Sequence, residues 1–383
     1  MKRMKVKIGD VCTLKSGTSL KDNVLNDTDG IPYIKVSDMN LVGNEKYIIT
    51  ANSYADESID TKMLFPKGTI LFPKRGGAIG TNKKRIANRV VCADLNTMGV
   101  IPSEIIRPLF LYYYFQNIDF GTLYNGSSVP QINNTDIAPM EIELLSLDEQ
   151  DEAIEVLEKI DSIIRKRKTE LKKLDELIKA RFVEMFGHQS HNEKQLPYLT
   201  IDDVAEIYLG ITHTPTYVES GVMFISAKNT SGDFLDLSDV KYISREEFES
   251  SPKGSKPQVN DVLFSRVGSN LGHPVILEED LELCTFVSLG FLRTKGNVTS
   301  NYLKHWMRDD FFAKQVSEHV KGGGQPNLNT GWLKEFKIIV PDIECQREFD
   351  AFCKQVDKSK FVIQKALEEA QVLFDSLMQK YFG

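Results

Sequence analysis

The chain contains little cysteine and no long apolar run. Its five cysteines form an odd number, and no two of them are spaced as C-x-x-C. This argues against both a disulfide framework and a zinc site. No stretch reaches the roughly 18 consecutive apolar residues that a membrane helix needs. We therefore expect a cytoplasmic protein, in a reducing compartment, in which Cys353 is a small core residue.

Motifs for catalysis and for cofactor binding are also missing. The sequence has no Walker A motif, no G-x-G-x-x-G after a strand and no motif for methyl transfer to an amino group. The glycine-rich residues 75–80 do not have the spacing of a nucleotide-binding loop. His188 and His191 stand in a polar linker without further ligands, and Asp27–Gly30 is typical of a turn. We therefore expect no metal and no cofactor in this chain.

An excess of positive charge is the third feature that the sequence lacks. The formal net charge is -7 at pH 7. Residues 1–147 carry 17 Lys and Arg against 15 Asp and Glu, whereas residues 187–342 carry 15 against 21. Any contact with nucleic acid must therefore come from local clusters of cations.

What the sequence does have is an internal repeat. Residues Gly126–Gln150 and Gly322–Gln346 align without a gap, 196 positions apart. Ile8–Gly17 similarly resembles Ile201–Gly210, at an offset of 193. Such small drifts in offset are expected where surface loops accept insertions. The chain is a twofold duplication rather than a solenoid. A solenoid needs more than two repeats, and its repeats are much shorter than these units.

Each half begins with about 145 residues of short apolar runs bounded by Gly, Pro, Asn and Asp, which indicates strands joined by loops. Helices are predicted within these parts at Arg107–Asn117 and Ser300–Val316. The fold class is therefore α+β. We expect four parts: a globular domain at 1–147, a long helix at 148–187, a second globular domain at 188–343 and a second long helix at 344–383.

The two long helices carry apolar stripes at coiled-coil spacing. The first helix has a capping-box pattern at Ser146 and Glu149 and a stop signal at Gly187, and it would be roughly 58 Å long. The alternative is that each helix packs only on its own domain, but both stripes keep one heptad phase, which favours antiparallel pairing. The predicted pairing residues are Leu157, Ile160, Ile164, Leu171, Leu174 and Ile178 in the first helix and Phe349, Val356, Ile363, Leu367, Phe374 and Leu377 in the second.

Loops rich in cations, glycine and short polar side chains are the candidates for recognition. Cations suit phosphates, Arg can read guanine, and Asn or Gln can read adenine. The alternative for each single residue is a solvated loop or a turn, and Asn133 and Asn329 could simply cap the next element. The candidates in the first half are Ser19, Lys21, Lys74, Arg75, Gly76, Gly77, Lys83, Lys84, Arg85, Ser127, Ser128, Gln131 and Asn133. Those in the second half are Thr212, His213, Thr214, Arg266, Ser269, Asn270, His273, Lys321, Gln325, Asn327 and Asn329.

This organisation resembles the specificity subunit of type I restriction–modification systems. Two dissimilar globular parts alternate with two similar helices, and the joins read GSSVPQIN…LSLDEQ and GGGQPNLN…VPDIECQ. The resemblance covers essentially the whole chain. One departure concerns the residue before the helix, which is Pro341 in the second join but Leu145 in the first.

The resemblance implies a non-catalytic subunit that binds double-stranded DNA. Each globular domain would be a target-recognition domain that reads one half of an asymmetric split site. The paired helices would set the spacing and dock two modification subunits, which hold S-adenosylmethionine and methylate adenine, and restriction (motor-nuclease) subunits would join for cleavage. Two alternatives stay open: the specificity subunit of a system that fuses nuclease and methyltransferase, and a helical adaptor without a role at DNA.

Overall fold

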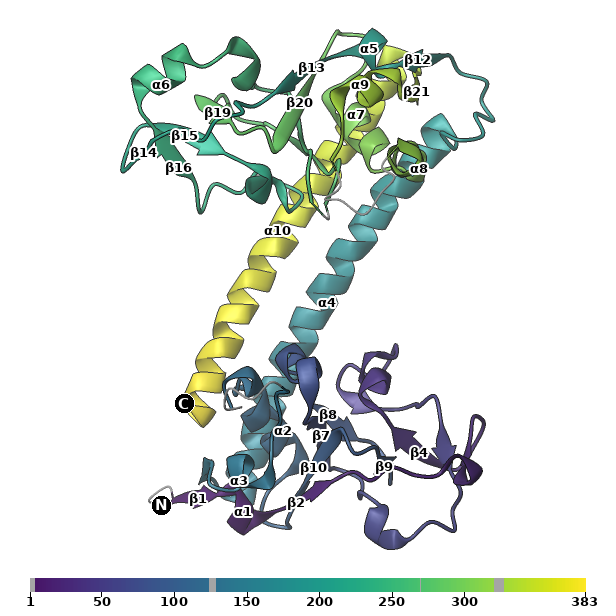
Figure 1. Ribbon diagram of the computed structural model, residues 1–383, viewed down its shortest axis with the longest axis vertical. Coiled ribbons are helices and arrows are strands. Elements are labelled where there is room, and N and C mark those ends of the chain that lie inside the picture. The colour runs from purple at the N-terminus through teal and green to yellow at the C-terminus, as the bar shows by residue number, and fades with distance from the viewer. Residues whose placement is uncertain (1–3, 124–128, 269, 320–326) are drawn as a thin grey trace. The chain divides into compact units, whose positions relative to one another are not determined.

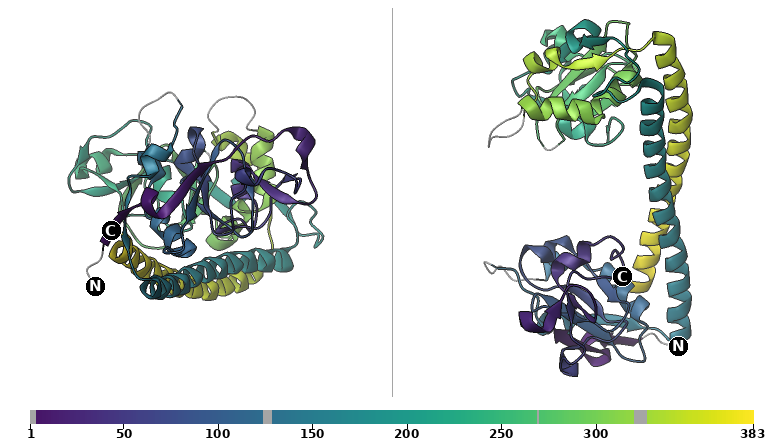
Figure 2. Two further views of the ribbon diagram at one scale, coloured as in Figure 1. Left: turned by 90° about the horizontal axis from the view of Figure 1, so that it is seen from below. Right: turned by 90° about the vertical axis from the view of Figure 1, so that its right-hand side faces the viewer.

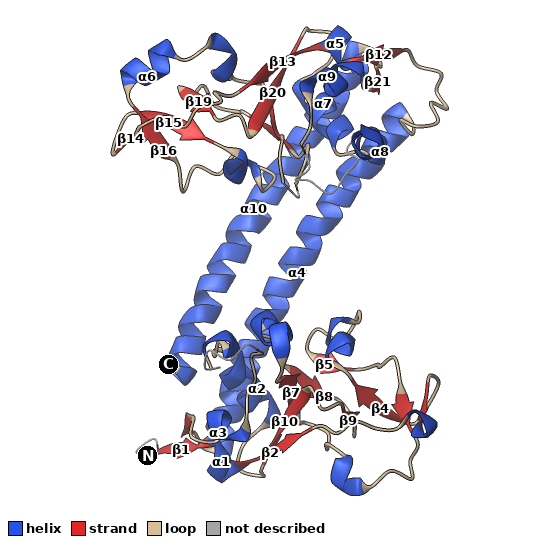
Figure 3. Ribbon diagram, viewed as in Figure 1, coloured by secondary structure: helices blue, strands red, loops and turns tan. Residues whose placement is uncertain are grey.

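The computed structural model describes residues 4–123, 129–268, 270–319 and 327–383. It combines sheets and helices, as the α+β prediction requires (Figures 1 and 3). The chain divides into two compact units. Unit 1 comprises Met1–Lys168 with Lys365–Gly383, and unit 2 comprises Thr169–Gln364. Each unit therefore contains one globular part and a segment of each long helix. No helix among the described residues is both long and apolar enough to cross a membrane.

Three sheets form the globular part of unit 1. The largest has the order β2-β10-β7-β8-β5 and is antiparallel except for the pair β5 and β8. Its strands are β2 (Cys12–Ser16), β10 (Thr97–Pro102), β7 (Ile70–Pro73), β8 (Arg85–Ala87) and β5 (Tyr47–Ile48). The second sheet consists of β3 (Leu25–Asn26), β6 (Tyr54–Ala55), β4 (Ile31–Ile34) and β9 (Cys92–Ala93), and the third of β1 (Met4–Lys7) and β11 (Glu141–Leu144). The helices are α1 (Ile8–Val11), α2 (Pro108–Gln116) and α3 (Asn134–Ile137), with short 3-10 helices that include η2 (Val36–Asn40) and η4 (Gly76–Thr81).

Unit 2 repeats this plan. Its first sheet has the order β13-β20-β17-β18, with β13 (Ala205–Leu209), β20 (Leu289–Thr294), β17 (Val262–Ser265) and β18 (Pro274–Ile276). A second sheet contains β14 (Tyr217–Val218), β16 (Lys241–Ile243), β15 (Val222–Ile225) and β19 (Leu283–Thr285), and β12 (Tyr198–Thr200) pairs with β21 (Lys337–Ile339). The helices are α5 (Ile201–Val204), α6 (Arg245–Ser250), α7 (Ser300–Met307), α8 (Asp310–His319) and α9 (Thr330–Glu335), and the 3-10 helices include η6 (Ala227–Thr230).

One predicted helix is two helices in the structure. The sequence predicts a single helix over Ser300–Val316, but α7 ends at Met307 and α8 begins at Asp310. The Asp309 carboxylate accepts a hydrogen bond from the main-chain N–H of Phe311 at 2.8 Å, which satisfies a donor at the start of the second helix. The break lets α8 fold back, so that the rings of Trp306 and Phe312 pack with centroids 5.0 Å apart.

The two long helices are α4 (Leu147–Phe186) and α10 (Ile343–Phe382). The predicted cap of α4 is confirmed, because the Ser146 N–H donates to the Glu149 carboxylate at 2.9 Å. The predicted stop is also confirmed, since Gly187 follows the helix with a φ of +75°. The departure from the family pattern at Leu145 leaves the helix start intact, and that side chain is buried.

Segments of α4 and α10 lie side by side in each unit (Figure 2). In unit 1, Leu157 of α4 shares a core with Phe374 and Leu377 of α10. In unit 2, Ile178 and Phe182 of α4 share a core with Phe349, Cys353 and Val356 of α10. The beginning of each helix thus packs with the end of the other, which is the antiparallel pairing that the sequence predicts. Every residue predicted to pair is buried or half-buried.

A buried glutamine ties each long helix to its globular part. Gln150 of α4 accepts from the main-chain N–H of Arg107 at 2.8 Å, and its amide donates to the carbonyls of Ile105 and Leu145. Gln346 of α10 repeats the pattern with the Thr299 N–H at 2.9 Å and the carbonyls of Asn297 and Pro341. Both side chains are 0% exposed. The glutamine that recurs in the two joins therefore links each long helix to the start of a helix in its globular part, α2 or α7. Its recurrence in the sequence did not indicate this structural role.

Candidate nucleic-acid interface

The candidate loops of each unit meet at one edge of the large sheet. In unit 1, the last residues of β2 and β7, Ser16 and Pro73, pair with Met98 and Thr97 at the start of β10. In unit 2, Leu209 of β13 and Ser265 of β17 occupy the same places, paired with Gly290 and Leu289 of β20. The loops that follow these strands therefore leave the sheet together.

Matching main-chain hydrogen bonds hold these loops in both units. The Thr18 N–H donates to the Ala93 carbonyl at 2.8 Å, and the Ile211 N–H donates to the Thr285 carbonyl at 2.9 Å. The preceding residue is glycine in both halves because a second chain passes close by. A Cβ on Gly17 would lie 2.1 Å from the Asp94 carbonyl oxygen, and one on Gly210 would lie 2.3 Å from that of Thr285. Only glycine permits this approach.

Arg75 is the most firmly oriented of the exposed candidate cations. It pairs with Gln131 as an isolated antiparallel bridge, flanked by main-chain hydrogen bonds from Ile132 to Lys74 at 2.9 Å and from Gly76 to Pro130 at 2.8 Å. The Gln131 side-chain oxygen accepts from Nε of Arg75 at 3.2 Å and from Nη2 at 3.0 Å. Gln131 in turn donates to the Asn133 oxygen at 2.6 Å. The guanidinium plane is thus fixed while the group stays exposed.

Unit 2 repeats the bridge with different side chains. Val267 pairs with Asn327, and the Leu328 N–H donates to the Arg266 carbonyl at 2.8 Å. The residue after the bridge is a glycine with positive φ in both units, +72° at Gly76 and +92° at Gly268. The same turn therefore presents an arginine in one half and a valine in the other.

One predicted contact is wrong. Lys84 is 0% exposed, and its ammonium donates to Asn82 Oδ1 at 2.6 Å and to the Ile118 carbonyl at 2.7 Å. Burial lowers the pKa of Lys84 to about 8. This lysine closes the loop after η4 and cannot reach a phosphate from inside the core.

Several other candidate cations are engaged within the fold. Lys74 is half-buried and donates to Ser16 Oγ at 2.7 Å, and burial lowers its pKa. Arg85 donates to the carbonyls of Lys84 and Met39, and Lys83 bonds to Asn40. In unit 2, Arg266 donates to the carbonyls of Val287 and Leu328. Their contacts with DNA stay predictions.

The remaining described candidates are mostly exposed polar side chains. His213 bonds to Glu247 at 2.8 Å, and His273 bonds to the Gly232 carbonyl at 2.9 Å while burial lowers its pKa. Asn133 and Asn329 are the N-cap residues of α3 and α9, which is the capping role weighed above, and the Asn329 oxygen accepts from the Gly331 N–H at 2.7 Å. Other exposed candidates are Ser19, Lys21, Gly77, Thr212 and Thr214, together with Asn270, which donates to the Ser231 carbonyl, and Asn327 of the bridge. The candidates Ser127, Ser128, Ser269, Lys321 and Gln325 lie outside the described residues.

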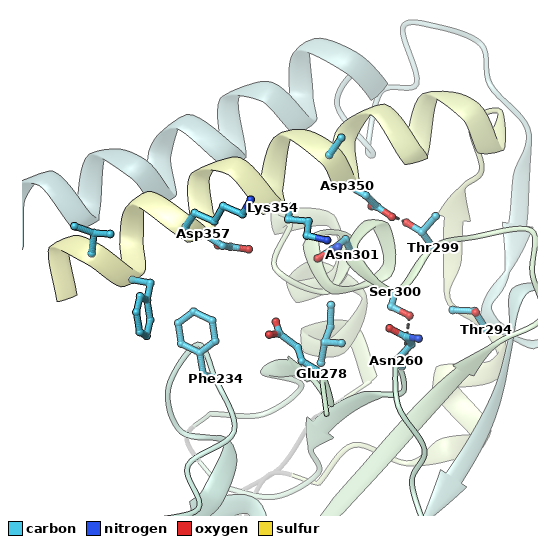
Figure 4. A pocket seen from close by; sticks show the side chains of 15 residues that line it. Phe234, Asn260, Glu278, Thr294, Thr299, Ser300, Asn301, Asp350, Lys354 and Asp357 are labelled. Carbon is cyan, nitrogen blue, oxygen red and sulfur yellow. Dashed lines mark hydrogen bonds between the residues drawn. The ribbon is translucent and has the colours of Figure 1, made fainter. Parts of the chain in front are cut away.

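A groove in unit 2 is a second candidate surface. It has a volume of about 1000 Å³ and lies between α10 and the globular part (Figure 4). Phe361 and Val362 of α10 line it and are 71% and 66% exposed. Glu278, Lys354 and Asp357 surround its polar side. These two adjacent exposed apolar side chains make the groove a candidate for a surface that another molecule covers.

Ionic contacts that the sequence did not indicate fix each globular part to a long helix. In unit 1, Lys46 lies in the loop after η2, bonds to Glu158 of α4 and donates to the Tyr113 hydroxyl at 3.0 Å. In unit 2, Asp233 follows η6 and pairs with Arg308 at 2.9 Å and with Lys360 of α10 at 3.1 Å. Within the described residues, no three His, Cys, Asp or Glu side chains form a possible metal site.

Comparison with known proteins identifies the family. The family model for the type I restriction modification DNA specificity domain matches residues 2–174 and 193–371. The chain belongs to this family of specificity subunits, with two target-recognition domains.

Individual relatives are distant in sequence but similar in extent. The type I restriction enzyme MjaIX specificity subunit of Methanocaldococcus jannaschii is 21% identical, over 98% of this chain and 91% of that protein. The crystal structure of the type I restriction-modification system S subunit from M. genitalium has a TM-score of 0.58 at 16% identity and covers 100% of this chain and 96% of its own. A second structure, from work on assembly and conformational transition of the type I system, has a TM-score of 0.54 at 19% identity, with 99% and 97% covered. These two structures share the fold.

Proposed function

We propose that this chain is the non-catalytic DNA-reading subunit of a type I complex, in which each globular part reads one half of an asymmetric bipartite site. The observation that carries the proposal is the paired loop cluster. Both units hold their loops with the same main-chain bonds, but the side chains at the shared turn differ, Arg75 against Val267. Equal scaffolds with unequal side chains suit two half-sites of different sequence.

We further propose that α4 and α10 determine the spacing between the half-sites. Each is 40 residues long, and their apolar residues pack against each other in both units. Inserting one heptad into both helices keeps the apolar phase. The expected result is a longer spacer with unchanged half-sites, measured from the modified motif. An unchanged spacer would remove the helices from this role.

The groove at Phe361 and Val362 is our proposed docking surface for a modification subunit, which would supply S-adenosylmethionine and the methyl transfer. Burying an exposed Phe or Val against a partner is favourable by about 1.5–3 kcal/mol each. Phe361→Asp together with Val362→Asp should therefore weaken copurification with the modification subunit at least tenfold. Lys365→Asp, on the same helix outside the groove lining, is the control. Equal losses in both variants would count against the groove.

The decisive experiment is a genome-wide methylation map. The chain is co-expressed with its neighbouring methyltransferase gene in a host that lacks the modification. We expect one asymmetric split motif with methyladenine in both halves, and restriction subunits should then direct cleavage to the unmodified motif. If the complex forms but leaves no mark, the proposal fails in favour of the adaptor. If the genome neighbour is a fused nuclease–methyltransferase, the same map assigns the chain to that system.

A further inference from the structure

We propose that Arg75 reads a guanine in the half-site of unit 1 and that Gln131 is the positioning residue that aims it. This inference rests on the proposed function and adds the identity of one base to it. The relevant geometry is the edge of the guanidinium that Gln131 occupies. Its oxygen takes the N–H groups of Nε and Nη2 on one side, at 3.2 and 3.0 Å.

The opposite end of the guanidinium stays available. Nη1 of Arg75 has no hydrogen-bond partner among the described residues, and Nη2 keeps its second hydrogen pointing away from Gln131. These two N–H groups form the parallel fork that matches the O6 and N7 acceptors of guanine in the major groove. Adenine presents a donor at the position of O6, so the same fork does not fit it.

The surroundings of Arg75 give the fork room to approach a base. The next two residues are Gly76 and Gly77, and a Cβ on either would meet nothing within 4 Å. Among the described residues, the space beside these two glycines of the turn is therefore open. The main chain of the turn is held by its bridge to Gln131, so the position of the arginine is set before DNA arrives.

A fixed orientation distinguishes base reading from phosphate binding. A phosphate accepts a cation from many directions, so a fixed plane adds little to that contact. A two-point contact with a base edge depends on direction, and it gains when the side chain is ordered in advance. Gln131 orders Arg75 without adding a negative charge, so the full positive charge of the fork is kept.

Unit 2 provides an internal comparison at the same turn. Val267 replaces Arg75 and Asn327 replaces Gln131, while the bridge and the following glycine are retained. Val267 has no donor for guanine. We therefore expect no guanine contact from this position in the half-site that unit 2 reads. A substitution of Val267 serves as the matched control.

The test uses the complete complex with its modification subunits and a randomised DNA library, from which bound sequences are selected. The variants are Arg75→Ala, Arg75→Lys and Gln131→Ala, with Lys83→Ala and Val267→Ala as controls. We expect Arg75→Ala to reduce discrimination at one G·C pair of one half-site by roughly 10- to 100-fold. Arg75→Lys should recover affinity but only part of the discrimination, because lysine lacks the planar fork. Gln131→Ala should lose discrimination at that same pair, to a smaller degree.

The controls separate the possible failures. Lys83→Ala should weaken binding to all sequences alike, and Val267→Ala should leave the half-site of unit 1 unchanged. If Arg75→Ala also weakens all sequences alike, Arg75 is a phosphate contact and the inference is overturned. A change at an A·T pair, or no change in either half, overturns it as well. If the unaltered complex selects no bipartite sequence, the proposed function itself fails.

Discussion

The two halves of the molecule share a main-chain frame but differ in the side chains at its tips. The loops after β2 and β13 are held by equivalent hydrogen bonds to the Ala93 and Thr285 carbonyls, and buried Gln150 and Gln346 make equivalent triple contacts. Arg75 and Val267, by contrast, occupy the same turn with opposite chemistry. The main-chain positions are thus a property of the repeated frame, whereas the exposed side chains that it presents differ between the halves.

The contacts that fix each globular part to a long helix also differ, with reversed polarity. Unit 1 places a lysine, Lys46, against Glu158 of α4, while unit 2 places an aspartate, Asp233, against Lys360 of α10. Both charged residues follow the corresponding 3-10 helices η2 and η6. The reversal means that the two globular parts do not have interchangeable contacts with the helices, although their frames correspond.

The largest expected effect tests whether the two joins are equivalent. Gln150→Ala and Gln346→Ala each leave a main-chain N–H and two carbonyls without their partner, in a place from which the protein excludes water. We expect a loss of about 2–3 kcal/mol in each unit. Hydrogen exchange at the starts of α2 and α7 measures each loss separately. Gln355→Ala, at an exposed site on α10, is the control, and a loss in one unit alone would break the equivalence.

The next largest effect tests the reversed polarity of the ionic contacts between each globular part and its long helix. Lys46 is 6% exposed, so Lys46→Met removes a buried cation from the partly buried Glu158 carboxylate, which keeps its hydrogen bond from the Tyr113 hydroxyl. We expect unit 1 to lose about 1–2 kcal/mol, because removing one partner of such a pair strands the other charge. Asp233→Asn should act on unit 2 only. Hydrogen exchange measured in each unit gives the loss of stability of that unit. A loss of stability in both units from either substitution would contradict this prediction.

The Asp233 contact also predicts a pH dependence. Burial raises the pKa of Asp233, but Arg308 and Lys360 outweigh burial and lower the pKa from 3.8 to about 2. The stabilising contribution is therefore complete above the unfolded-state pKa and is lost as the pH falls from about 4 to 2. Because about a third of the side chain is exposed, we expect the contribution to be about 1 kcal/mol after screening. Asp233→Asn should remove this part of the acid sensitivity of unit 2.

The sequence could predict the long helices because their signals are local and periodic. The heptad stripe, the Ser146 cap and the Gly187 stop each act within a few residues. The two-domain organisation followed in the same way from the repeat. The break between α7 and α8 was missed because it depends on Asp309 and on the packing of Trp306 against Phe312, which a helical pattern does not reveal.

The candidate site was predicted as loops rather than as residues, for a physical reason. Lys84 belongs to a run of cations that looks exposed in sequence, yet its ammonium has partners at Asn82 and Ile118 inside the core. Arg75, nine residues earlier in the same run, stays outside because its bridge to Gln131 holds the turn at the surface. Gln131, the partner of Arg75, is 56 residues away in the sequence. Local composition therefore could not distinguish the exposed Arg75 from the buried Lys84.

The smallest expected effect tests the N-cap residues that precede α3 and α9. The Asn329 oxygen accepts from the Gly331 N–H at 2.7 Å, whereas at Asn133 the main-chain N–H donates to the Asp136 carboxylate at 2.7 Å. Asn329→Ala should therefore destabilise α9 by about 0.5–1 kcal/mol. Asn133→Ala should change α3 less, because one half of its capping box, the contact from the main-chain N–H to the Asp136 carboxylate, survives the substitution. Its effect should instead reach Gln131, whose amide loses its acceptor. Hydrogen exchange of α3 and α9 distinguishes the two cases, and equal destabilisation of both helices would show that the asparagines have one common role as caps.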